Sequence, residues 1–100
     1  MYAILIHTTY GPGTRARAEQ MADRVTQDFR TRPGFKSATF YEADAIEGEY
    51  GGLVIWETKE AAEAALDASL ASAHLIRDGL GLQPQRIGNH RIVEIYEPKP

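Results

Sequence analysis

Residues 53–58 read Leu-Val-Ile-Trp-Glu-Thr, and this stretch decides the fold of the chain. Four consecutive apolar residues place apolar side chains on both faces of a strand, because successive side chains point to opposite faces. Residues 2–7, Tyr-Ala-Ile-Leu-Ile-His, have the same character. A strand with two apolar faces needs a covering layer on each side. We therefore expect both segments to be central strands of one sheet.

Two helices and two further strands are predicted around these segments. Gly-Pro breakers, capping threonines and apolar periodicity set their limits. The predicted elements are a strand over 2–9, a helix over 14–31, a strand over 35–43, a hairpin loop over 44–48, a strand over 50–57, a helix from 58 to about 79 with a break within 67–72 left open, and a strand over 86–97. This βαββαβ order predicts one ferredoxin-like α+β domain over residues 1–100, with a four-stranded antiparallel sheet.

The second predicted helix has an alanine-rich inner stripe, which allows close packing on a sheet. The stripe consists of Ala62, Ala65, Leu66, Ser69, Leu70 and Ala73. Two helices cover only one face of a four-stranded sheet, so the other face needs a second layer. A second copy of the chain is the simplest candidate, and we expect a homodimer that forms a dimeric α+β barrel.

The composition excludes several classes of function. There is no cysteine, so disulfides and thiolate metal sites are ruled out. The net charge of −3 comes without a basic block, which argues against a nucleic-acid partner. No apolar run approaches the roughly 20 residues of a membrane span. The first residues lack a basic start and a cleavage site, so we expect a cytoplasmic protein.

Three motifs resemble the antibiotic biosynthesis monooxygenase family of the dimeric α+β barrel superfamily. They are Pro33-Gly34-Phe35 at the start of the second strand, Val54-Ile55-Trp56-Glu57-Thr58-Lys59-Glu60-Ala61 at the junction of third strand and second helix, and His74 further along that helix. The resemblance implies a dimer with a pocket between each sheet and its helices. It also implies cofactor-free oxygenation of aromatic polyketides or quinols, haem degradation, or isomerisation of a small molecule.

Trp56 and His74 match family positions and are candidates for the site. Trp56 either fills the core or forms a stacking wall for a flat aromatic ligand. His74 is either satisfied by a backbone carbonyl or acts as a general base or haem ligand. Haem-degrading relatives also carry an Asn on the first strand and a Trp on the second helix, and both are missing here, which argues against that mechanism.

The remaining candidates are polar residues on the predicted strands and helix end. His7 shares an otherwise apolar strand face with Ala3 and Leu5, so it lines a cavity or has an internal partner. Arg77 either binds an anionic substrate oxygen or complements the helix dipole. The alternation of side chains along a strand does not decide which of four residues on the edge strands point inward. These are Tyr41, Asn89, His90 and Tyr96. No two histidines have helical metal-ligand spacing, so no metal is expected.

We interpret the chain as a cofactor-independent monooxygenase of a small aromatic, quinol or polyketide-like substrate. In this hypothesis His74 or His7 is the base, and Trp56, Tyr41, Arg77 and Asn89 contact the substrate. His74 and Trp56 should then line one cavity, with His7 or Tyr41 nearby. The alternative is a dimer of the same fold that binds a small molecule or haem without catalysis.

Overall fold

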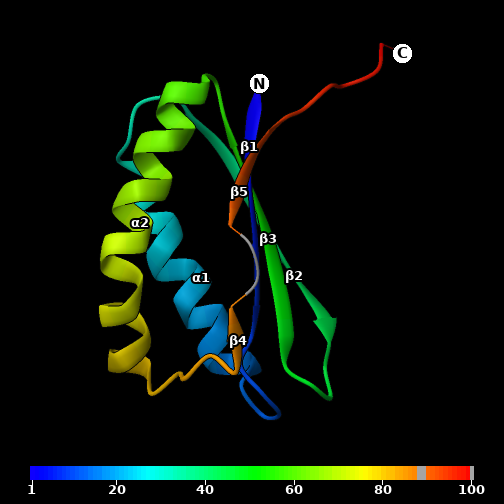
Figure 1. The fold of residues 1–100 in the computed structure, drawn as a ribbon, viewed down its shortest axis with the longest axis vertical. Helices are drawn as coiled ribbons and strands as arrows, with labels where there is room; N and C mark the ends of the chain where they lie inside the picture. The colour runs from blue at the N-terminus through cyan, green and yellow to red at the C-terminus, as the bar shows by residue number, and fades with distance from the viewer. Residues whose placement is uncertain (88–89, 100) are drawn as a thin grey trace.

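The computed structural model describes residues 1–87 and 90–99, without the side chains of residues 86 and 87. Its elements are β1 (Tyr2–Thr9), α1 (Arg15–Arg30), β2 (Phe35–Asp44), β3 (Glu49–Trp56), α2 (Lys59–Leu80), β4 (Arg86–Ile87) and β5 (Arg91–Glu94). The predicted ferredoxin-like α+β order is confirmed. The strand predicted over 86–97 ends earlier than expected, at Glu94, and the parts of it that the structure describes are β4 and β5 (Figure 1).

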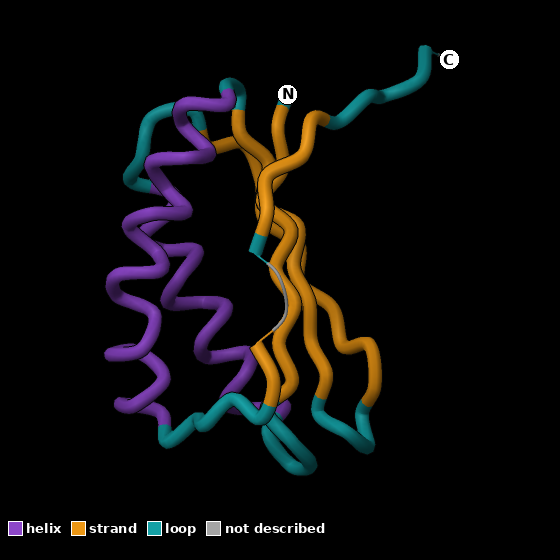
Figure 2. The backbone as a smooth tube through the Cα atoms, viewed as in Figure 1, coloured by secondary structure: helices purple, strands orange, loops and turns teal. Residues whose placement is uncertain are grey.

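The sheet is antiparallel and has the strand order β2-β3-β1-β4, with β5 also paired to β1. The two strands that the sequence makes apolar on both faces, β1 and β3, are therefore the central neighbours, as predicted. Their register sets Ile4 opposite Val54 and Leu5 opposite Leu53. Both helices lie on the same side of this sheet (Figures 1 and 2).

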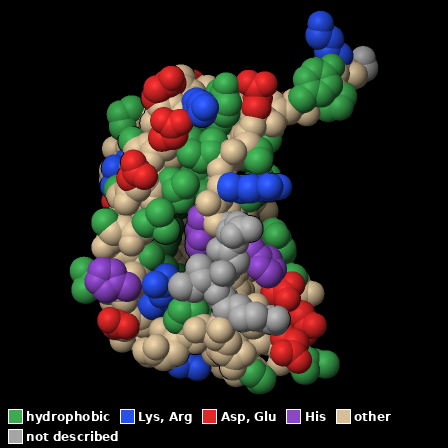
Figure 3. Space-filling model, in the orientation of Figure 1, with side chains coloured by type: hydrophobic (Ala, Val, Ile, Leu, Met, Phe, Trp, Pro, Cys, Tyr) green, Lys and Arg blue, Asp and Glu red, His purple; other side chains and the backbone are tan. Residues whose placement is uncertain are grey.

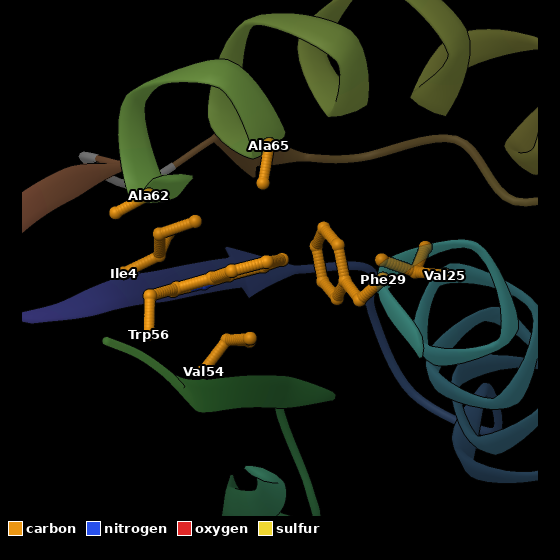
Figure 4. Close-up of a cluster of buried hydrophobic side chains, with 7 residues drawn as sticks. All are labelled: Ile4, Val25, Phe29, Val54, Trp56, Ala62 and Ala65. Atoms are coloured by element: carbon orange, nitrogen blue, oxygen red, sulfur yellow. The ribbon is translucent and has the colours of Figure 1, made fainter. Parts of the chain in front are cut away.

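The core lies between the helix layer and one face of the sheet. Trp56 is fully buried, and its ring meets those of Phe29 and Phe35 edge-on, each at a centroid distance of 5.6 Å. Figure 4 shows Phe29 at the end of the Trp56 ring, with Ala62 and Ala65 of α2 above it. These small alanines bring α2 close to the sheet, which is why the tryptophan is enclosed completely.

Helix α2 begins and ends where its sequence indicates. The Thr58 hydroxyl accepts a hydrogen bond from the backbone N–H of Ala61, which caps the first turn. Gly81 ends the helix in the left-handed conformation, at φ 68°. The helix is continuous over 67–72, so the break left open there does not occur. Leu70 is 56% exposed, and its assignment to the inner stripe was wrong.

The second face of the sheet carries no element of this chain in the views of Figures 1 and 2. Side chains alternate between faces along a strand, so the partners Leu5 and Leu53 point away from the Ile4 and Val54 side. Ile55 lies on the same outer face, and all three are only partly buried. Within residues 1–87 and 90–99, no helix combines the length and the apolar character needed to cross a membrane.

Candidate functional site

A cavity of about 80 Å³ lies between the sheet and the two helices. Its lining is contributed by every layer of the fold: Ile6, Thr8 and Tyr10 from β1 and its end, Ala18, Met21, Ala22 and Val25 from α1, Phe40, Tyr50 and Gly51 from β2 and β3, Ser69, Ala73 and Arg77 from α2, and His90 before β5. Most of these side chains are apolar. A few polar groups converging in an apolar cavity are the usual form of a small-molecule site.

Tyr10 and Arg77 form the polar centre of this cavity. The Arg77 guanidinium lies close enough to the Tyr10 hydroxyl to interact with it. Burial raises the pKa of Tyr10 above its ordinary value, and the positive charge of Arg77 offsets part of that rise. Tyr10 is therefore neutral at physiological pH, and its O–H group remains available to donate a hydrogen bond to a ligand.

Tyr50 forms a fixed part of the wall. Its hydroxyl lies 3.1 Å from the Thr14 hydroxyl, and its ring packs on that of Tyr10 at a centroid distance of 6.1 Å. Thr14 in turn donates to the carbonyl of Gly11 at 2.7 Å. Thr14 thus occupies the N-cap position of α1 but bonds backwards to the loop, and this bond helps to fix the end of the cavity at which Tyr10 lies.

The electrostatics of the cavity favour a ligand with negative charge. Arg77 brings a positive charge to the lining. The lining contributed by the described part of the chain contains no Asp or Glu. A phenolate, enolate or carboxylate oxygen placed near Arg77 would therefore be attracted, and the attraction is stronger here than in water because the surroundings are apolar.

His74 and Trp56 do not line this cavity, so the predicted arrangement was wrong. Trp56 is enclosed in the core, where no ligand reaches its ring. His74 is exposed on α2, because the inner face of the helix runs through Ser69, Ala73 and Arg77. Residue 74 is turned by about 100° from residue 73 and so points away from the sheet.

His7 and Tyr41 lie together, but on the outer face of the sheet. With Leu53 and Arg91 they border an open depression there, away from the Tyr10–Arg77 pair. The His7 ring nitrogen Nε2 lies 3.2 Å from a Glu49 carboxylate oxygen. Any role of these two residues in substrate binding stays a prediction, and it would require a ligand or a partner on that face.

Three other expectations concern the end of the chain. Asn89 falls outside the described residues. His90 points into the cavity, whereas Tyr96 is 80% exposed on the segment that leaves the sheet. Of the substrate-contact candidates within the described residues, Arg77 is the one that lines the cavity, and its role stays a prediction. Within residues 1–87 and 90–99, no three His, Asp or Glu side chains gather as metal ligands would.

Tyr10, Tyr50 and Phe40 were not predicted from the sequence as cavity residues. The sequence did contain a sign that Tyr10 faces the cavity. Residues 4, 6, 8 and 10 lie on one face of the first strand, and this face changes from apolar to polar toward residue 10. Figure 3 shows hydrophobic side chains between α2 and β5.

No model of a protein family matches the chain, and no curated protein matches it in sequence. Solved structures do match in fold. SnoaB, a cofactor-independent oxygenase from Streptomyces nogalater, superposes in a mutant form with a TM-score of 0.73 at 20% identity, covering 99% of this chain and 96% of that chain. An antibiotic biosynthesis monooxygenase gives a TM-score of 0.70 at 10% identity, covering 97% and 100% of the two chains.

The monooxygenase from the gene ActVA-Orf6 of Streptomyces coelicolor, in complex with nanaomycin D, also matches, with a TM-score of 0.65 at 24% identity. The alignment covers 99% of this chain and 91% of that chain. The chain has the fold of the antibiotic biosynthesis monooxygenases. The predicted resemblance is confirmed at the level of fold, and at these identities the chemistry must be argued from the cavity itself.

Proposed function

We propose that the chain is an oxygenase that needs no cofactor and acts on a small, electron-rich aromatic substrate such as a quinol or an anthrone. The observation that carries the proposal is the Tyr10–Arg77 pair, two oxyanion-binding donors in a mostly apolar cavity. The fold shared with a cofactor-independent oxygenase supports it.

The proposed chemistry begins with loss of a proton from the substrate. His90 lines the cavity and is the base in this proposal, replacing His74 and His7. The resulting enolate oxygen is stabilised by the Arg77 guanidinium. The carbanion form then reduces oxygen and forms a C–O bond to it, which gives a hydroperoxide. Loss of water leaves a carbonyl group, so that CH₂ and O₂ become C=O and H₂O.

The apolar lining contributes by keeping water away from the carbanion, which water would otherwise reprotonate. Tyr10 keeps its proton and can donate a hydrogen bond to the peroxide oxygen. Removing one such donor typically costs about 10²–10³ in turnover. The two donors and the apolar lining are together the contribution that we assign to the protein.

The functional unit in this proposal is a homodimer joined through the outer face of the sheet. Support comes from the partly buried apolar residues of that face, Leu5, Leu53 and Ile55. Residues 95–99 extend away from the body of the chain, as Figure 2 shows, and could reach a second copy. The two cavities would lie on the far sides of the joined sheets, each complete within one chain. A cytoplasmic location stays a prediction.

Oxygen consumption tests the proposed function directly. Purified protein is supplied with hydroquinone, 1,4-dihydroxynaphthalene and anthrone, and uptake is compared with that of heat-denatured protein. We expect faster uptake with at least one substrate, and one atom of ¹⁸O₂ in the carbonyl product. Uptake equal to the denatured control for all three substrates contradicts the proposal.

The small volume of the cavity favours a second candidate function, binding without turnover. A volume of about 80 Å³ holds a ring only when the ligand extends beyond it, and leaves little room for oxygen beside the ring. In this case anthrone would bind, as measured by a titration under nitrogen, and no oxygen would be consumed. The same two measurements therefore separate the two candidates.

A further inference from the structure

The cavity is smaller than an aromatic ring requires. An apolar cavity of about 150 Å³ holds one benzene molecule, whereas the space beside Tyr10 and Arg77 measures about 80 Å³. A neighbouring groove of about 280 Å³ lies between α1 and the β2–β3 hairpin, and Arg15, Glu19 and Glu42 line its outer part. An aromatic ligand bound beside Tyr10 and Arg77 therefore has to extend beyond this space, and displacing the wall between cavity and groove would let it extend into the groove.

Five residues line both spaces and so form this wall. They are Ala18, Ala22, Phe40, Tyr50 and Gly51. Two are alanines and one is a glycine, so their side chains offer little to move. Tyr50 is held by the Thr14 hydroxyl at 3.1 Å and by the Tyr10 ring. Phe40 is the remaining large side chain of the wall.

Phe40 is placed to move. It is 36% exposed, it lies outside the buried core cluster, and it borders a third hollow along α1 as well. Its ring rests on Gly52, where an added Cβ would come within 2.7 Å of the ring. Because Gly52 has no side chain, the ring lies directly against its backbone. Ala22 of α1 lines the same two hollows as Phe40. No polar contact of Phe40 has to be broken, because its side chain carries no polar atom.

We propose that Phe40 is the specificity-determining residue of the cavity: it is the movable partition that sets how large an aromatic ring can reach the Tyr10–Arg77 pair. Ligands of more than one ring bind with Phe40 displaced and extend from the cavity into the groove. The proposal rests on the proposed function only in taking the ligand to be aromatic. It needs no oxygen chemistry, so it can be tested by binding alone.

The test compares a one-ring and a two-ring probe, phenol and 2-naphthol, by NMR titration under nitrogen. The quantity measured is the ratio of the two dissociation constants, so a general effect on the fold cancels. Phe40→Ala should shift this ratio in favour of 2-naphthol by about tenfold relative to the wild type, the scale on which an apolar pocket discriminates by size. Phe40→Trp should shift it the other way.

Ile46→Ala is the control, because Ile46 is an exposed apolar residue at the tip of the same hairpin. It should leave the ratio unchanged. If Phe40→Ala does not fold, Phe40→Leu serves in its place and should shift the ratio in the same direction. A ratio that stays within twofold in the Phe40 variants overturns the proposal, as does the absence of binding in every variant. Binding without oxygen uptake would reject the oxygenase and leave the role of Phe40 intact.

Discussion

Tyr10 holds its proton more tightly in the folded chain than in the unfolded chain, because burial disfavours the phenolate. A pKa raised by folding stabilises the fold at pH values below the unfolded pKa, which is about 10 for tyrosine. This contribution is lost as the pH rises through the higher, folded-state pKa.

We therefore expect the free energy of unfolding of the wild type to fall more steeply above pH 10 than that of Tyr10→Phe. Urea denaturation at a series of pH values measures this difference. Tyr96→Phe serves as control, since Tyr96 is exposed outside the cavity, and should follow the wild type. Parallel curves for the wild type and Tyr10→Phe would show that Tyr10 titrates as it does in the unfolded chain.

The role of single residues was harder to predict than the strands that carry them. Trp56 was correctly placed at the end of a central strand, but its depth depends on Phe29, Phe35 and the α2 alanines, which are remote in sequence. His74 was expected on the inner face of α2, but the residue of that face is its neighbour Ala73. Including Leu70 in the inner stripe turned the predicted helix face toward His74, whereas the true face runs through Ser69, Ala73 and Arg77.

At one end of the sheet, the loop after β1 packs against the turn of the β2–β3 hairpin, and both loops have a glycine at the contact. The backbone N–H of Tyr10 donates to the carbonyl of Gly48 at 2.8 Å, which joins the end of β1 to the β2–β3 hairpin. A Cβ on Gly48 would overlap the backbone of Gly11, and Gly48 also has a φ of 69°. No side chain fits at this position without separating the two loops.

Gly48→Ala should therefore lower the free energy of unfolding by about 1–3 kcal/mol through overpacking, in addition to about 1 kcal/mol for the left-handed backbone. Gly13→Ala is a matched control, because Gly13 has a φ of 74° but nothing within 4 Å of its added Cβ. It should show the backbone cost alone. Equal losses in the two variants, measured by urea denaturation, would mean that the loops do not pack as described.

The elements themselves were predictable because several local signals agree. Thr58 and Gly81 mark the ends of α2, and the greater polarity of β2 agrees with its place as an edge strand. The Gly51-Gly52 pair indicated a close approach, and the structure places the rings of Tyr41 and Phe40 over these two glycines. The sequence could not show that Phe40 also borders the cavity, since this depends on how α1 packs against the hairpin.

At the scale of the whole molecule, the outer face of the sheet carries the partly buried apolar residues Leu5, Leu53 and Ile55, which the proposed dimer would cover. We expect sedimentation at micromolar concentration to show a dimer. Leu53→Asp should dissociate it, because a carboxylate would be buried without a partner in the proposed interface. Leu70→Asp should not, since Leu70 lies on α2, away from that face. A wild type that sediments as a monomer, or a dimer that only Leu70→Asp dissociates, rejects this interface.

The proposed chemistry as a whole depends on Arg77 rather than His74. The direct measurement is oxygen consumption with anthrone by the wild type, Arg77→Met and His74→Ala. We predict that Arg77→Met lowers kcat/KM by about 10²–10³ through loss of oxyanion stabilisation, and that His74→Ala stays within twofold of the wild type. A wild type that consumes no oxygen, an unimpaired Arg77→Met, or a loss of activity confined to His74→Ala would contradict this assignment.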